Sequence, residues 1–144
     1  MRSAAHRYLL DTNIVSDLVH DPHGDAVRRI ARAGEGAVCT SIVVACELRF
    51  GAQKKRSARL SAQLESILQV LPVLPLEPGA DRHYGEIRAH LERNGRPIGA
   101  NDLLIAAHAR AAGMQLVTRN ADEFSRVPGL KVTTWSASPR VRRG

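Results

Sequence analysis

The stretch YLLDTNIVSDLV, residues 8–19, decides how the rest of the sequence is interpreted. Tyr8–Leu10 is a short apolar run that predicts a strand, and it changes abruptly to polar residues at Asp11. Apolar side chains then recur at helical spacing, at Ile14, Val15, Leu18 and Val19. A strand followed directly by a helix is the repeating unit of an α/β fold, and Asp11 stands at the junction between the two.

The same alternation continues along the chain. Further strands are predicted at Ala37–Thr40, Gln115–Thr118 and Lys131–Thr134, and Val70–Leu76 is at best an edge strand because it contains two prolines. Further helices are predicted at Asp25–Ala33, Ser41–Ala52, Ser57–Gln69, from Pro78 and Gly79 to about Asn94, and at Asp102–Ala112. A basic hinge, Gln53–Arg59, separates two of them. This order predicts a three-layer α/β/α sandwich with a mostly parallel sheet, whose ligands bind beyond the carboxyl ends of the strands.

Length and composition limit the possible functions. A chain of 144 residues fits one domain, expected at residues 1–135, followed by a basic tail at 136–144. The excess of 21 Lys+Arg over 14 Asp+Glu gives a net charge of +7, which indicates a polyanionic partner. Aromatic residues make up 3% of the chain, so recognition should depend on phosphates and shape rather than on base stacking.

The two cysteines, Cys39 and Cys46, lack partners at zinc-binding spacing, which suits a reducing cytosol and two buried structural thiols. No apolar run approaches the roughly 18 residues that a membrane span needs, and no signal-peptide core precedes Asp11. The protein is therefore expected in the cytoplasm, without a membrane partner.

Four oxygen-bearing side chains lie among apolar neighbours: Asp11, Glu47, Asp102 and Asn120. An ionised carboxylate in apolar surroundings is costly unless it is paired or coordinates a metal ion. Oxygen-only ligands favour Mg²⁺ or Mn²⁺ over zinc or copper. On a basic chain, such a site suggests metal-assisted hydrolysis of phosphodiesters.

Each of the four has a structural alternative. Asp11 could cap the helix that follows it, either Asn101 or Asp102 could cap the helix they begin, and Asn120 could be a left-handed turn residue. For Glu47 the alternative is an ion pair with a nearby arginine. Its helical neighbours are nevertheless apolar, at Val43, Val44, Phe50 and Gly51.

The segments LLDTN, TSIVVACELRFGA, IGANDLLIAAHA and LVTRNADEFSRVPGL together resemble the PIN-domain ribonucleases, specifically VapC-type toxins of bacterial toxin–antitoxin pairs. The resemblance extends from about Tyr8 to Trp135. It implies a Mg²⁺- or Mn²⁺-dependent endoribonuclease in which Asp11, Glu47 and Asp102 are metal ligands and catalytic residues. It also implies a homodimer and an antitoxin protein that covers the acidic site.

The fourth acidic position of that family is occupied here by Asn120, with Asp122 and Glu123 close behind, so that Asn120 or Asp122 is the expected fourth ligand. The resemblance assigns Thr118, just before it, to the site. Thr12 and Thr118 carry hydroxyls that could orient a metal-bound water.

Basic side chains follow Glu47 closely, at Arg49, Lys54, Lys55 and Arg56. They could hold RNA phosphates on either side of the cut, with Arg119 near the scissile phosphate, or form an ordinary solvated surface. Two other functions fit parts of the pattern. A haloacid-dehalogenase-type phosphatase has a similar strand and motif, but its second aspartate is Asn13 here. A non-catalytic nucleic-acid- or partner-binding module could keep the fold and have lost activity through Asn120.

Overall fold

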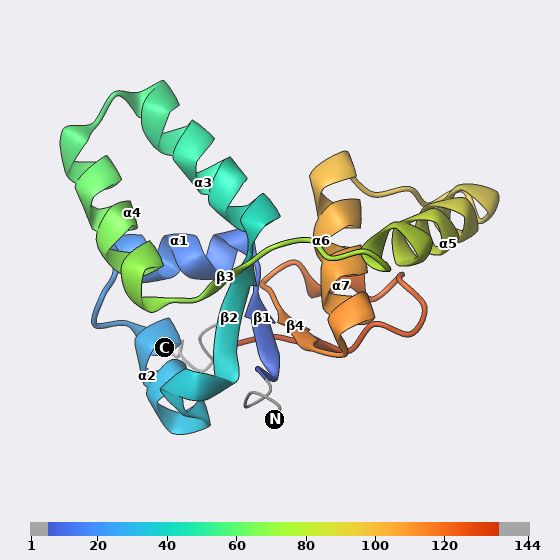
Figure 1. Ribbon diagram of the computed structural model, residues 1–144, viewed down its shortest axis with the longest axis horizontal. Helices are drawn as coiled ribbons and strands as arrows, with labels where there is room; N and C mark the ends of the chain where they lie inside the picture. Colours follow the sequence, from blue (N-terminus) through green and yellow to red (C-terminus); the bar gives the residue numbers. More distant parts are fainter. Residues whose placement is uncertain (1–5, 136–144) are drawn as a thin grey trace, which may run out of the picture.

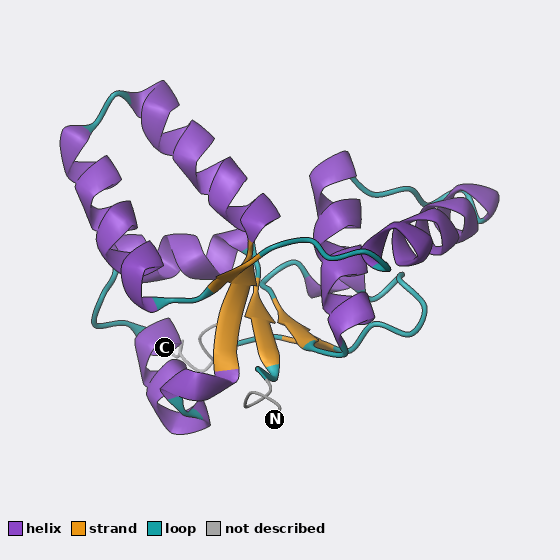
Figure 2. Cartoon of the chain, viewed as in Figure 1, coloured by secondary structure: helices purple, strands orange, loops and turns teal. Residues whose placement is uncertain are grey.

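The computed structural model describes residues 6–135, and the predicted tail at 136–144 lies outside them. Five strands form one sheet in the order β3-β2-β1-β4-β5, and every pairing is parallel (Figures 1 and 2). The strands are β1 Tyr8–Leu10, β2 Val38–Ser41, β3 Val73–Leu74, β4 Gln115–Val117 and β5 Val132–Thr133. The expected parallel sheet is confirmed, and β3 lies at its edge, as the prolines predict.

Helices cover the sheet as two groups (Figure 1). Their bounds are α1 Thr12–His20, α2 Asp25–Ala33, α3 Ile42–Lys55, α4 Ala58–Val70, α5 Ala80–Arg93, α6 Ala100–Ala112 and the short α7 Ala121–Phe124, with a 3₁₀ helix at Glu35–Ala37. Helices α3 and α4 form a hairpin that packs with α1, whereas α5 packs on α6. The α/β/α sandwich is therefore confirmed.

The boundaries of α3 and α6 are among those that differ from the prediction. The predicted hinge at Gln53–Arg59 is shorter, because α3 continues to Lys55 and only Arg56 and Ser57 separate it from α4. Arg56 makes the turn in the left-handed conformation, with φ of 53°. The N-cap residue of α6 is Gly99, so Asn101 and Asp102 lie in its first turn, and the prediction that one of them is the cap was wrong.

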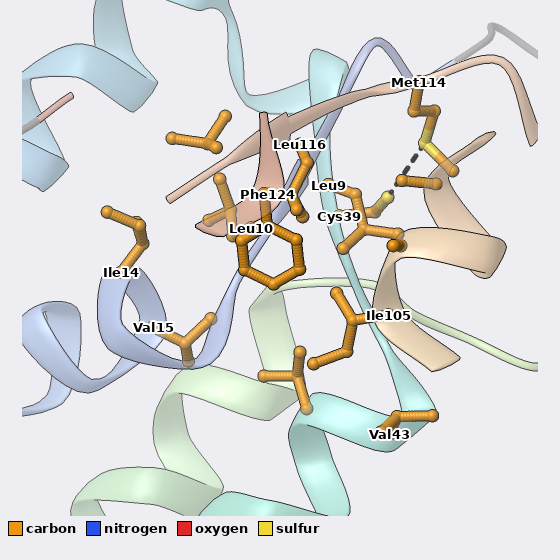
Figure 3. Close-up of a cluster of buried hydrophobic side chains, with 14 of the residues drawn as sticks. Leu9, Leu10, Ile14, Val15, Cys39, Val43, Ile105, Met114, Leu116 and Phe124 are labelled. Atoms are coloured by element: carbon orange, nitrogen blue, oxygen red, sulfur yellow. Dashed lines mark hydrogen bonds between the residues drawn. The ribbon is translucent and has the colours of Figure 1, made fainter. Parts of the chain in front are cut away.

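The core surrounds β1, which is buried on both faces as central parallel strands usually are. Leu9 and Leu10 pack with side chains from α1, α6 and β4, and the fully buried ring of Phe124 from α7 joins the same cluster (Figure 3). Since α7 is a single turn of helix, burial of Phe124 is what fixes it against the sheet.

The two cysteines differ. Cys39 is buried with its Sγ 3.4 Å from the Sδ of Met114, and burial raises the pKa of its thiol to about 12 (Figure 3). Cys46 is exposed, which corrects the expectation of two buried thiols. Among the described residues, no helix has the length and apolar character needed to cross a bilayer.

Candidate metal centre

Asp11 lies at the carboxyl end of β1 and is 4% exposed. Leu10 pairs with Val117 of β4, so the residues that follow, Asp11 and Thr118, come together beyond the ends of two neighbouring strands. The Thr118 hydroxyl donates to Asp11 Oδ2 at 2.7 Å, and the Asn13 amide lies 3.5 Å from the same oxygen. Asp11 precedes α1, but within residues 6–135 its side chain makes no capping hydrogen bond to that helix. Asp11 therefore does not cap α1 through its carboxylate in the way the alternative required.

Glu47 projects from α3 toward the same end of the sheet. The Thr12 hydroxyl donates to its Oε1, and the Asn101 amide donates to its Oε2 at 3.1 Å. Among the described residues Glu47 forms no ion pair, so the structure gives no support to the alternative of a buried arginine partner. Its apolar surroundings are one-sided, because Phe50 is 67% exposed and only Val43 and Val44 are buried.

Asp102, in the first turn of α6, faces Glu123 of α7. Burial raises the pKa of Asp102 to about 7, and a hydrogen bond with Glu123 and the negative charges of Glu123, Asp11 and Glu47 act in the same direction. Burial also raises the pKa of Asp11; the hydrogen bond from Thr118 opposes that rise, and the charges of Glu47 and Glu123 add to it. The four carboxylates are thus close enough to destabilise one another's charged forms.

The fold brings Glu123 into the acidic cluster more directly than either expected fourth ligand. Asn120 is exposed and donates through its side-chain amide to Glu123 Oε1 at 2.6 Å. With φ of −103°, Asn120 is not the left-handed turn residue that was the alternative for it. The side chain of Asp122 is exposed, and its carbonyl accepts a hydrogen bond from Ser125. Glu123 stands close to Asn120 in the sequence, but nothing in a four-residue helix indicates which way its side chain points.

The donor set fits a hard divalent cation. Carboxylates at the N-cap of α1 and on α3, α6 and α7 lie close enough to affect one another's charge, and the amide side chains of Asn13 and Asn120 contact two of them. Carboxylate and amide oxygens are the ligands that Mg²⁺ and Mn²⁺ prefer. Across residues 6–135, no three acidic, histidine or cysteine side chains already stand in a ligating arrangement. In the metal-free chain both Glu47 oxygens accept hydrogen bonds and Asp102 is hydrogen-bonded to Glu123. Ligation of an ion by these carboxylates would exchange such bonds for bonds to the ion.

The expected RNA-binding side chains are spread over two regions. Lys54 and Lys55 are in the last turn of α3, about 11 Å along the helix from Glu47 at 1.5 Å per residue. Arg49 forms an exposed ion pair with Glu65 of α4. Arg119 is nearer to the acids: its backbone N–H donates to Asn13 Oδ1 at 3.1 Å, and its guanidinium lies 3.5 Å from Asp17.

Comparison with known proteins places the chain in a family. The model of the PIN domain matches residues 8–130. The tRNA(fMet)-specific endonuclease VapC of Shigella flexneri is 39% identical over 131 residues, which are 90% of this chain and 98% of that protein.

Solved structures agree with this. The chain resembles a chain of DNA-bound VapBC from Salmonella typhimurium with a TM-score of 0.82 and 33% identity, over 91% of this chain and 99% of that one. It resembles a chain of VapBC2 from Rickettsia felis, bound to a promoter DNA fragment, with a TM-score of 0.81 and 34% identity, over 90% and 98%. The chain therefore belongs to the PIN domain family, among the VapC ribonucleases.

Proposed function

We propose that this protein is a Mg²⁺- or Mn²⁺-dependent endoribonuclease that acts in the cytoplasm as the toxin of a toxin–antitoxin pair. The observation that carries the proposal is the convergence of Asp11, Glu47, Asp102 and Glu123 beyond the ends of β1 and β4. Four carboxylates on a chain of net charge +7 form a local acidic site within a surface suited to a polyanion. Asn120 then acts by holding Glu123 rather than as the main fourth ligand.

A cation in this site would polarise the scissile phosphate and lower the pKa of a bound water, so that no side-chain nucleophile is needed. The residues of the chain supply orientation. Thr118 and Asn13 hold the Asp11 carboxylate, and Thr12 holds that of Glu47. Burial and the neighbouring carboxylates raise the pKa of Asp102, so cation binding should favour loss of a proton from the Asp102–Glu123 pair.

The substrate and partners follow from the relatives. The Shigella protein is named for cleaving tRNA(fMet), which supports a structured RNA, and tRNA first, as the substrate here. The Salmonella and Rickettsia structures are VapBC complexes, which supports a cognate antitoxin of the VapB type as a partner. Homodimerisation is part of the same proposal. Lys54, Lys55, Arg56 and Arg119 are proposed to contact phosphates, and the ion pair of Arg49 with Glu65 makes Arg49 the weakest member of the set.

The two other functions have less support. A haloacid-dehalogenase-type phosphatase needs a second aspartate as general acid, and Asn13 in that place instead donates to Asp11. A non-catalytic module would follow from the loss of the acid at Asn120, but Glu123 supplies a carboxylate only one helical turn later.

RNA cleavage by the purified chain tests the proposal. We expect a tRNA substrate to be cut with Mg²⁺ or Mn²⁺, to survive in excess EDTA, and to be cut again when metal is restored. The Asp102→Asn protein should bind the same RNA without cutting it. Undiminished cleavage in EDTA would remove the metal from the mechanism, whereas binding without cleavage by the unaltered chain would favour the non-catalytic module. Growth arrest on expression, relieved by the neighbouring antitoxin gene, would test the toxin assignment.

A further inference from the structure

A buried hydrogen bond joins the two helices that carry Glu47 and Asp102. Ser41 ends β2 and is the N-cap of α3, where its Oγ accepts from the backbone N–H of Val43 at 3.1 Å. The Nδ1 of His108, on α6, lies 2.7 Å from the same Oγ. Ser41 is 0% exposed and His108 is 4% exposed. The Ser41 hydroxyl can accept from Val43 and at the same time donate its proton to His108 Nδ1.

The bond is close to both acids along the chain. Glu47 follows Ser41 on α3 by less than two helical turns, and Asp102 precedes His108 on α6 by the same distance. Both helices are rigid over such a length, so a tie between Ser41 and His108 sets how far apart the two carboxylates can stand. Both residues of this tie are buried.

A second tie between α3 and α6 behaves differently. The Asn101 amide donates to Glu47 Oε2, so this contact occupies an oxygen that a cation would need, and it lies at the exposed side of the site. Binding of a cation through that oxygen breaks the contact with Asn101. The bond between Ser41 and His108 uses no acidic oxygen, so binding of a cation would not need to break it.

The environment of His108 fits a structural acceptor rather than a titrating group. Burial lowers the pKa of His108, and the charge of Glu77 opposes this effect without reversing it. The lowered pKa favours the neutral ring at pH 7. The ring also lines a cavity of about 320 Å³ beside Glu77 and Arg82. A side chain of slightly different shape at this position therefore has room to be accommodated.

We propose that His108 is a positioning residue for the metal centre, and that its hydrogen bond to Ser41 holds Glu47 and Asp102 at the separation that ligation of one ion requires. The inference rests on the proposed function, because it takes both carboxylates as ligands of the same site. His108 itself touches neither metal nor RNA in this role.

Two substitutions of His108 separate the bond from the bulk of the ring. In His108→Asn the amide places a polar atom where Nδ1 stood, whereas in His108→Gln the amide reaches the place of Nε2, so that Ser41 keeps its hydrogen bond from Val43 and loses the one to residue 108. Calorimetric titration should show that the His108→Asn protein binds Mn²⁺ with an affinity within about threefold of the unaltered chain. The His108→Gln protein should bind Mn²⁺ about tenfold or more weakly. The Gln protein should also lose kcat for RNA cleavage at saturating metal without a change in KM.

A partner substitution tests whether the effect passes through Ser41. Ser41→Ala should weaken Mn²⁺ binding as His108→Gln does. The variant that carries both substitutions should bind Mn²⁺ no more weakly than whichever single variant binds it less tightly. If His108→Gln does not fold, Ser41→Ala compared with Ser41→Thr makes the same comparison, since threonine keeps the hydroxyl. Folding is checked by helical circular dichroism and by the unfolding midpoint.

The outcomes are distinct. If the folded His108→Asn and His108→Gln proteins bind Mn²⁺ as tightly as the unaltered chain, the positioning role is overturned and the proposed function stays intact. Loss of thermal stability in the Gln protein with unchanged Mn²⁺ affinity would also overturn it, because His108 would then be only a core residue. If the unaltered chain binds no Mn²⁺, the proposed function fails and the positioning role fails with it.

Discussion

Thr118 and Asp11 are 107 residues apart in sequence, yet the Thr118 hydroxyl donates to the Asp11 carboxylate at 2.7 Å in the buried centre of the acidic site. The hydrogen bond exists because β1 and β4 are neighbours in the sheet and end at the same level. The same hydroxyl oxygen accepts from the backbone N–H of Asn120 at 2.9 Å. Thr118 therefore links the end of β1 to the loop that leads to Glu123.

Replacing Thr118 by valine removes this donor without a change of volume. The hydrogen bond from Thr118 is the larger of two that oppose the rise in the Asp11 pKa, the other coming from the backbone of Thr12, so its loss should raise that pKa further and weaken Mn²⁺ binding about 10- to 100-fold. Thr118→Ser keeps the hydroxyl and should stay close to the unaltered chain. Calorimetry and an RNA cleavage assay measure both variants. Equal affinity in the valine and serine proteins would show that the Thr118 hydroxyl does not support the site.

Glu123 and Asp122 form a matched pair for identifying the fourth acid. They are adjacent in α7, but Glu123 bonds Asp102 and Asn120 whereas the Asp122 side chain is exposed. We expect Glu123→Gln to lower kcat for RNA cleavage by about tenfold or more, and Asp122→Asn to leave it nearly unchanged. The reverse result would make Asp122 the fourth ligand, as the sequence alone allowed.

Much of the site follows from sequence because local pattern determines it. The strand that ends at Leu10 places Asp11 beyond the sheet, and helical spacing alone puts Glu47 and Asp102 on helices. Glu123 could not be selected in this way, because α7 is barely one turn long and has no periodicity to orient its side chains. The buried Phe124, which fixes α7 against the sheet, does so through tertiary packing.

Other differences have similar causes. Gln53–Lys55 resembled a loop because they are polar, but α3 projects from the sheet as part of a hairpin and its last turn is surrounded by solvent (Figure 1). A helix in that position needs no apolar face at its end. The expectation that Cys46 is buried rests on its lack of partners at zinc-binding spacing, which says nothing about the face of α3 on which it lies, and the residue is exposed. The pairing of Ser41 with His108 joins two elements that no local pattern connects.

His108 predicts a dependence of stability on pH. Burial lowers its folded-state pKa below the value of about 6.5 in an unfolded chain, so the unfolded state binds a proton first as the pH falls. The contribution of His108 to stability is therefore complete above pH 6.5 and is lost as the pH falls toward the folded-state pKa. Denaturant unfolding between pH 5 and 7.5 measures it. His108→Asn should flatten this part of the profile, and an unchanged slope in that variant would assign the effect to other groups.

The end of α3 predicts how RNA binding depends on salt. Replacing Lys54, Lys55 and Arg56 by alanine should weaken RNA binding and lower the slope of log K against log salt by about 0.7 to 0.9 for each phosphate that these side chains neutralise. Mn²⁺ affinity should not change. A control that removes the same charge from α2, by replacing Arg28, Arg29 and Arg32, should change the slope less, because α2 leads into the start of β2 and so lies at the opposite end of the strands from Asp11 (Figure 1). Equal slopes for the two variants would make the basic residues of α3 an ordinary solvated surface.

Glu47→Gln sets the two possible roles of this residue against each other. As a ligand, Glu47 contributes one negative charge to a cluster of four, so the near-isosteric amide should leave the metal-free protein as stable or more stable. Its hydrogen bonds can be kept, because the new amide oxygen still accepts from Thr12 and the Asn101 amide can rotate to present its oxygen to the new N–H₂ group. Activity should fall by more than the 10- to 100-fold typical of residues that only support a ligand.

The structural role predicts the opposite result. If Glu47 instead balances a buried cation, its substitution leaves that cation unpaired and lowers the free energy of unfolding by about 3 kcal/mol. Melting curves recorded in EDTA, compared with cleavage rates in Mn²⁺, distinguish the two roles. A lowered melting temperature with cleavage retained would exclude Glu47 from the metal centre. Since Glu47 is the acid that α3 contributes, that outcome would also leave the bond between Ser41 and His108 with no ligand to position.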